Sequence, residues 1–229
     1  MKKAFTLSEV LICLGIVGVV AALSVPATMK NYQKRLLTAQ LQKTYSKISS
    51  AAQTIMEIEH VDNFYDTTAI SCTKDGGGNC NTGVRDWFDK YFLPVQTNCG
   101  AGGTGECIAG TAADSYKTVD GNNAGTIAQY CIQTADGAAI CAFHNPNNVC
   151  MSLIVDVNSS AAPNIVGRDV FSMDMHRDGS ISDYQSGCAD NNYGAAASLC
   201  TKGPATDGVF SLAAGCLTSV IESGWKMEY

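Results

Sequence analysis

The sequence predicts an α+β protein in which a long N-terminal helix is followed by an antiparallel β-sheet with disulfide-closed loops. Three observations support this fold class. An apolar run at residues 5–27 leads into a segment with helical periodicity, alternating apolar segments joined by glycine turns follow Thr126, and ten cysteines lie outside the apolar run. At 229 residues the chain has room for one sizeable domain besides its N-terminal segment.

The first element is an apolar helix from Phe5 to about Met29, preceded by Lys2 and Lys3. It exceeds the ~20 residues that a helix needs to cross a bilayer. Glu9 interrupts this run near its start. A charged side chain costs roughly 2.5–3.5 kcal/mol at the centre of a bilayer and less near its surface, so Glu9 is a candidate functional residue.

Past Pro26 the apolar residues become periodic, which is typical of an amphipathic helix. We therefore expect one helix from about Phe5 to Glu59, bent at Pro26 because proline lacks an N–H. The apolar positions recur every three or four residues: Leu37, Leu41, Tyr45, Ile48, Ala52 and Ile55.

Residues 60–125 are rich in glycine and predict loops, with one short helix from Val84 to Phe92 that ends before Pro94. Disulfides Cys72–Cys80 and Cys99–Cys107 are candidates for closing these loops.

Strands are predicted from Thr126 onwards. Residues 127–134 and 138–143 form a hairpin whose three-residue loop ends in Gly137, which fits a type I turn with a G1 bulge. This register places Cys131 opposite Cys141, where a disulfide can form if the pair is not hydrogen-bonded. A strand at 151–157 and a second hairpin, 169–175 and 180–184, complete a sheet of four or five strands with the amphipathic helix on one face. A last helix is expected from Gly208 to Ser223, with Gly224 as its C-cap.

The cysteines indicate an exported, oxidised protein. Cys13 lies in the apolar run and is expected to act as a small hydrophobic residue. No pair is spaced C-x-x-C and the chain has three histidines, which disfavours a zinc or redox site and favours disulfides. The candidate disulfide cysteines are Cys72, Cys80, Cys99, Cys107, Cys131, Cys141, Cys150, Cys188, Cys200 and Cys216.

Charge is distributed unevenly. Residues 1–50 hold seven Lys/Arg and one Glu, a net charge of +6, and the remainder carries −12. The acidic body disfavours nucleic-acid binding, which needs clustered Lys and Arg. Lys30, Lys34 and Arg35 follow the apolar run and either meet anionic lipid headgroups or form a solvated helix face.

No catalytic motif is present, and no cofactor is expected apart from calcium as a candidate. Residues 174–185 partly match an EF-hand loop, but His176 and Gln185 stand where ligands are required. The alternative is ordinary turn chemistry. The calcium candidates are Asp156, Asn158, Asp169, Asp174 and Asp178.

The N-terminal segment, Lys2-Lys3-Ala4 followed by Phe5-Thr6-Leu7-Ser8-Glu9-Val10-Leu11, resembles that of type IV prepilins and type II secretion pseudopilins. The resemblance covers about the first thirty residues. It implies a leader, residues 1–4, that a prepilin peptidase removes between Ala4 and Phe5, although the family usually has glycine where this chain has Ala4. It also implies N-methylation of Phe5, a role for Glu9 in assembly and a helix-kinking role for Pro26.

The same resemblance implies a filament-core helix at residues 5–29 and a globular domain at residues 30–229. The protein would be held in the inner membrane by its N-terminal helix, with its body in the periplasm. It would assemble with itself and other pilin-like subunits into a helical filament, and would then be extracellular or at the cell surface. Cys188, Cys200 and Cys216 resemble the disulfide-closed C-terminal loop of type IV pilins. Some pseudopilins hold calcium in the part of the fold that corresponds to the calcium candidates between Asp156 and Asp178.

Two other interpretations of the N-terminus are considered. Lys2-Lys3, the apolar run and Val25-Pro26-Ala27 also fit a secretory signal cleaved after Ala27, which would make the protein a secreted, disulfide-rich binding protein. A plain membrane anchor is the other. The charged Glu9 disfavours the secretory signal, and the mature N-terminus distinguishes the alternatives.

Overall fold

The computed structural model describes residues 6–70, 82–100, 106–110, 115–127, 130–144, 151–184, 197, 200 and 213–229. The chain divides into two compact units, Met1–Leu36 and Leu37–Tyr229, and each is described by itself below.

The first element is the helix α1, Leu7–Glu59, which contains Pro26. It ends at the residue that the periodicity predicts. In the second unit its apolar stripe is buried, with Leu41, Ile48 and Ala52 fully removed from solvent. The amphipathic helix is thus confirmed, and burial of this stripe fixes which face of α1 turns towards the core.

The sheet of the second unit has six strands in the order β1-β4-β5-β6-β7-β8, and every neighbouring pair is antiparallel. This confirms the α+β class. The sixth strand, one more than expected, is the two-residue edge strand β1. The strands are β1 Gln96–Thr97, β4 Tyr130–Gln133, β5 Ala139–His144, β6 Met151–Asp156, β7 Val170–Met175 and β8 Ile181–Asp183.

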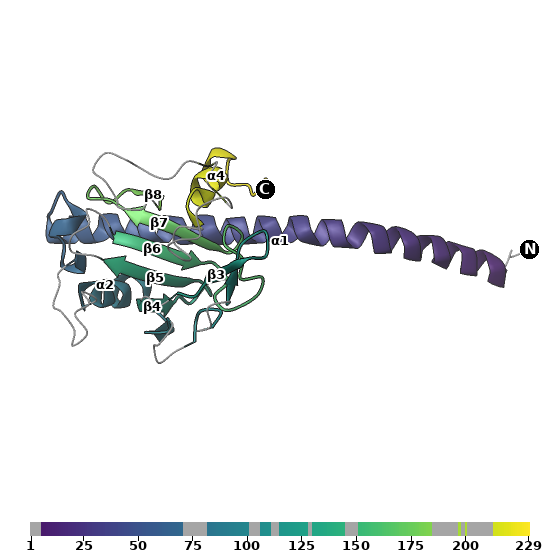
Figure 1. Ribbon diagram of the computed structural model, residues 1–229, viewed down its shortest axis with the longest axis horizontal. Helices are drawn as coiled ribbons and strands as arrows, with labels where there is room; N and C mark the ends of the chain where they lie inside the picture. The colour runs from purple at the N-terminus through teal and green to yellow at the C-terminus, as the bar shows by residue number, and fades with distance from the viewer. Residues whose placement is uncertain are drawn as a thin grey trace, which may run out of the picture. The chain divides into compact units, whose positions relative to one another are not determined.

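Both faces of this sheet are covered, because residues of opposite parity along the strands belong to two different cores. Leu153 and Phe171 pack with α1 and with α2, Thr82–Phe92. Ile154 and Val170 pack in a second core with Tyr116 and the cysteines of two disulfides. Figure 1 shows the strands side by side, with α2 beside β4 and β5. The helix-covered face is the one that the sequence predicts; the second core closes over the other face.

The first predicted hairpin is confirmed in its turn, its register and its disulfide. Gly137 has φ 90° and donates its N–H to Thr134, as a G1 bulge requires. Cys131 lies opposite Cys141 and is bonded to it, with 4.0 Å between the Cα atoms. The Cys131 carbonyl accepts a bond from the Cys99 N–H on the other side, so the Cys131–Cys141 pair is the non-hydrogen-bonded type.

The second hairpin also forms where the sequence predicts it. Met175 pairs with Ile181, and Gly179 turns the chain with φ 74°. The short helix predicted before Pro94 is α2. Within α2, Trp87 stacks on Phe88 and packs edge-to-face against Phe92. Trp87 also packs edge-to-face against Phe64, which lies in the 3₁₀ turn η1, Phe64–Asp66, just before η2, Thr68–Ile70.

Two parts of the body differ from expectation. The loop-rich region contains a second, two-stranded sheet of β2, Tyr116–Lys117, and β3, Asn123–Gly125. Among the described residues of the C-terminal stretch, 213–229, α4 spans Cys216–Glu222. The earlier part of the predicted helix, residues 208–212, lies outside the described residues. Gly215, with φ 81°, lies immediately before α4 and interrupts any earlier helical turn.

The end of α4 follows the prediction for Gly224. This residue has φ 66°, its N–H bonds to the Ile221 carbonyl, and the Trp225 N–H bonds to the Val220 carbonyl. That pair of bonds is a Schellman motif.

Three disulfides close the described parts of the second unit: Cys99–Cys107, Cys131–Cys141 and Cys200–Cys216. The first two are those the sequence analysis expects, and the third joins two of the three C-terminal cysteines. Cys13 is unbonded and exposed. The remaining candidates, Cys72, Cys80, Cys150 and Cys188, lie outside the described residues.

Candidate functional site

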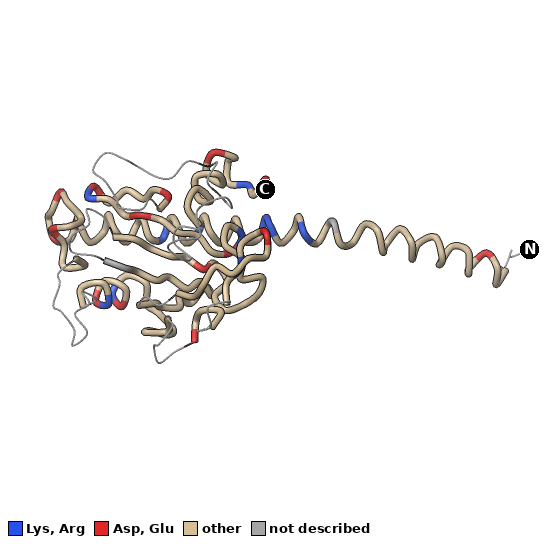
Figure 2. The backbone as a smooth tube through the Cα atoms, in the orientation of Figure 1, with Lys and Arg blue, Asp and Glu red and all other residues tan. Residues whose placement is uncertain are grey.

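The N-terminal half of α1 is apolar and exposed on all sides. An apolar window of this helix meets the length and composition needed to cross a membrane, and none of it is buried within the chain. Figure 2 shows this stretch free of charge apart from one acidic position near its start. Large exposed side chains lie all along it: Leu7, Leu11, Ile12, Leu14, Ile16, Val17, Val19, Val20 and Leu23.

Glu9 closes a hydrogen-bonded ring with Thr6 at the start of α1. Its Oε2 accepts the Thr6 N–H at 2.8 Å and the Thr6 hydroxyl at 2.8 Å, while the Glu9 N–H donates to the Thr6 hydroxyl at 3.3 Å. This is a capping box, in which two helix N–H groups without helical partners are satisfied reciprocally. Glu9 therefore has hydrogen-bond partners within its own chain.

The capping box was overlooked in the sequence analysis, although its signal is present. Thr6-Leu7-Ser8-Glu9 has the Thr-x-x-Glu spacing that precedes an apolar helix. The expected cleavage residues, Ala4 and Phe5, lie outside the described residues.

Pro26 lies inside α1 and leaves one helical hydrogen bond unmade. Hydroxyl groups on either side bond back to the helix: Ser24 donates to the Val20 carbonyl at 2.8 Å, and Thr28 donates to the Ser24 carbonyl at 3.0 Å. These bonds satisfy polar groups in a segment that is otherwise apolar.

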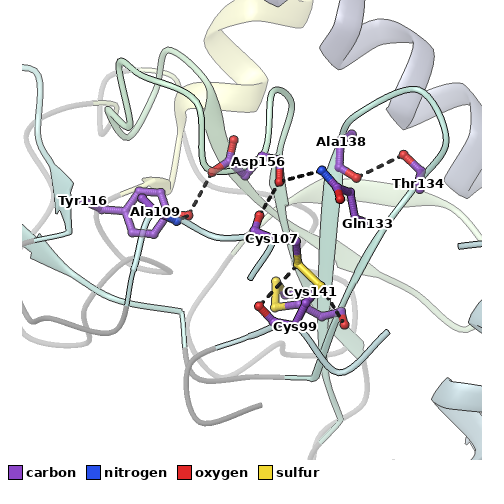
Figure 3. The surroundings of a disulfide bond; sticks show 11 residues. Cys99, Cys107, Ala109, Tyr116, Gln133, Thr134, Ala138, Cys141 and Asp156 are labelled. Atoms are coloured by element: carbon purple, nitrogen blue, oxygen red, sulfur yellow. Dashed lines mark hydrogen bonds between the residues drawn. A yellow bond between two sulfur atoms is a disulfide. The ribbon is translucent and has the colours of Figure 1, made fainter. Parts of the chain in front are cut away.

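Asp156, a calcium candidate, is instead part of a buried hydrogen-bond network that ties the second core together (Figure 3). The Tyr116 hydroxyl donates to its Oδ2 at 2.9 Å and accepts the Ala109 N–H at 3.0 Å. Ser159 links the same region to the first disulfide by donating to the Cys107 carbonyl at 2.5 Å. Asp156 thus anchors the β2–β3 sheet to β6, and Ser159 anchors the Cys107 end of the first disulfide.

Three of the other calcium candidates have similar structural partners. Asp169 accepts the N–H groups of Asn164 and Ile165, both at 2.7 Å. Ser152 donates to Asp174 across the strand pair β6–β7 at 2.8 Å, and Asp178 accepts the Ser180 N–H in the hairpin turn.

Asn158, the remaining candidate, donates its side-chain amide to the Ala161 and Ala162 carbonyls. Among the described residues no group of three or more His, Cys, Asp and Glu side chains is placed to hold a metal ion. The five candidates therefore share hydrogen-bonding roles, and the structure does not gather them into one centre.

Asp183 is a buried residue that joins two elements of the fold, and its role was not predicted from the sequence. It ends β8, and its carboxylate accepts the Gly215 and Thr218 N–H groups at the start of α4, both at 2.7 Å. Burial raises the pKa of Asp183 to about 7, although these N–H groups act in the opposite direction. Burial likewise raises the pKa of Asp169 to about 6.

Asp183 predicts a pH dependence of stability. Its pKa is 3.8 in the unfolded chain and about 7 in the folded one, so between these values the folded protein binds more protons. Its contribution is fully present below pH 3.8 and is lost as the pH rises through about 7. Wild type should therefore lose stability relative to Asp183→Asn as the pH is raised across this window.

Melting temperatures of both proteins across that window, measured by circular dichroism, check this expectation. Taking the difference removes the contributions of other groups, including His176, whose pKa burial lowers. A constant difference across the window would contradict it.

Comparison with known proteins identified no similar protein. No family model matches the chain, and neither the curated proteins nor the solved structures contain a match. Functional inference therefore rests on the residues and the geometry described above.

Proposed function

We propose that this chain is a structural subunit, a pilin or pseudopilin, of a type IV pilus or a type II secretion filament. In this proposal the subunit is inserted in the inner membrane with its body in the periplasm. A prepilin peptidase removes residues 1–4, and subunits then assemble with one another and with other pilin-like proteins through α1.

The observation that carries the proposal is the N-terminal half of α1, apolar and exposed on every side with Glu9 near its start. Exposed apolar surface of this extent requires another apolar environment. A bilayer provides it for the single subunit, and the helices of neighbouring subunits provide it in a filament. Glu9 favours the filament, because a simple anchor gains nothing from a carboxylate in this position.

The body supports an exported, structural role. Three buried disulfides favour folding in an oxidising compartment. The buried carboxyl groups of Asp156, Asp169 and Asp183 accept hydrogen bonds that join strands, loops and α4, which suits a rigid subunit rather than an enzyme.

The first test is the mature N-terminus. We expect the purified protein to begin at an N-methylated Phe5. Its intact mass should be that of residues 5–229 plus one CH2 unit, because the methyl group replaces a hydrogen, less two hydrogens per disulfide. The mass of a chain that begins at Thr28 would indicate a secretory signal. The mass of a chain that still contains residues 1–4 would indicate a plain membrane anchor. Either result would remove the pilin proposal.

A further inference from the structure

The character of α1 changes abruptly at Lys30. From Val10 to Met29 the helix carries no charged residue, and the next six residues are Lys30, Asn31, Tyr32, Gln33, Lys34 and Arg35. Lys30, Tyr32 and Arg35 are exposed, and Lys34 is half-buried. We call residues 30–35 the basic belt. It lies in the unit Met1–Leu36, which precedes the buried stripe that begins at Leu37.

The belt surrounds the helix and does not form a stripe along it. At about 100° per residue, Lys34 and Arg35 lie about 40° and 140° around the axis from Lys30. Tyr32 lies about 200° from it, and the exposed Gln33 about 300°, so polar side chains occupy every side. A helix that docks on a protein presents one face, as α1 does from Leu37 onwards. A helix that crosses a membrane surface meets the same surroundings on all sides, which the belt matches.

The lengths along α1 also match a bilayer. The stretch Leu7–Met29 rises about 34 Å at 1.5 Å per residue, close to the ~30 Å hydrocarbon thickness. The belt rises a further ~9 Å, comparable to one headgroup layer. Glu9 lies about 32 Å along the helix from Lys30, so a belt among headgroups on one side places Glu9 at the opposite boundary of the hydrocarbon.

No acidic residue of α1 lies near Lys30 or Arg35 in the sequence. From Val10 to Met56 the chain contains no Asp or Glu. Farther along α1, Lys43 and Lys47 pair with Asp136 at 3.1 and 3.6 Å. Tyrosine rings lie at headgroup depth at both surfaces of a membrane, and Lys and Arg near a membrane surface attract anionic lipid.

We propose that the basic belt binds the anionic phosphate headgroups of the bilayer and so fixes the depth of the unassembled subunit, with Glu9 at the far boundary. This inference rests on the membrane insertion in the proposed function and is independent of filament assembly. Each cation near a charged lipid surface is expected to favour anionic over zwitterionic lipid about fivefold.

The test uses the full-length chain in phosphatidylcholine vesicles that contain spin-labelled phosphatidylglycerol or spin-labelled phosphatidylcholine. Electron paramagnetic resonance then measures the preference of the protein-bound lipid layer for each headgroup. We expect wild type to prefer phosphatidylglycerol by well over fivefold, because three cations contribute, and the Lys30→Gln/Arg35→Gln variant to lower this preference at least about fivefold. Molar salt should weaken the wild-type preference, because it screens charges at a surface.

The matched control is Lys43→Gln/Lys47→Gln, which removes the same number of charges from the same helix where they already pair with Asp136. Its lipid preference should equal that of wild type. Equal affinity of wild type for both lipids would overturn the inference, and so would an unchanged preference in Lys30→Gln/Arg35→Gln.

Resistance to alkaline carbonate extraction is measured on the same vesicles. A chain that is extracted would overturn membrane insertion, and with it both this inference and the proposed function. An inserted chain without lipid preference would overturn this inference alone.

Discussion

Replacing Glu9 with alanine is expected to exclude the subunit from filaments almost completely while leaving its body folded. In a filament little water reaches the N-terminal helices, so an unpaired carboxylate there is costly. The α-amino group of a neighbouring subunit's Phe5, with a normal pKa near ~7.7–8.0, is cationic at neutral pH and can pair with Glu9. The pair forms only when the subunits are staggered so that one N-terminus lies beside the next Glu9. Wrong registers therefore leave a buried charge unpaired.

The capping box adds a second step to this mechanism. In the single subunit Glu9 already accepts the Thr6 N–H and hydroxyl, so pairing with a neighbour shares or exchanges these bonds. Glu9→Gln separates the two roles, because an amide oxygen can still accept from Thr6 but carries no charge. We expect Glu9→Gln to assemble as poorly as Glu9→Ala, since charge pairing is what selects the register.

Incorporation is measured by immunoblotting of sheared filaments, with leader cleavage and the melting temperature of the body checked in the same preparations. Ser8→Ala is the matched control. Ser8 is exposed beside Glu9, and its hydroxyl lies 3.2 Å from the Thr6 hydroxyl, so the substitution removes a polar contact at the same helix start but keeps the Glu9 carboxylate. Its incorporation should equal that of wild type. Wild-type incorporation of Glu9→Ala would show that the carboxylate does not select the register.

The parts of the fold that the sequence predicted depend on local patterns. The apolar stripe of α1, the glycine turns at Gly137 and Gly179 and the Cys131–Cys141 register all follow from the order of nearby residues. The alternation of apolar and polar residues with period two specifies the register of a strand, and both hairpins have the register that this alternation predicts.

The parts that were not predicted depend on distant contacts. β1 is a strand only because Val95 and Cys99 donate to β4. The start of α4 is held by Asp183, more than thirty residues earlier in the chain. From the sequence Asp156 was a candidate cation ligand beside turn residues, and only the fold shows that it accepts a hydrogen bond from the Tyr116 hydroxyl. No short-range pattern encodes these partners.

At the candidate site the sequence identified Glu9 but not its hydrogen-bond partners. The apolar run and Glu9 were evident without a structure, whereas the bonds between Glu9 and Thr6 required one. The basic belt was recognised as a charge cluster with two explanations. Its position directly after the exposed apolar stretch of the same helix favours the lipid surface.

The largest effect on the body is expected from Ile48→Asp. Ile48 is fully buried on α1, in the core that also contains Leu153 and Phe171 of the sheet. The substitution removes an apolar side chain, which by itself costs about 2–5 kcal/mol, and places a carboxylate where no partner is available. Because domains have a free energy of unfolding of only about 5–15 kcal/mol, the variant should be largely unfolded at room temperature.

The control for this substitution must add the same charge to the exposed side of the same helix. Lys43→Asp, which periodicity alone would suggest, is unsuitable because Lys43 pairs with Asp136 and an aspartate there would repel it. Gln42 is exposed, and Gln42→Asp should change stability by no more than about 0.5 kcal/mol. Urea denaturation of a chain lacking residues 1–27 compares the two variants. Similar midpoints for Ile48→Asp and Gln42→Asp would mean that the buried stripe of α1 does not hold the helix on the sheet.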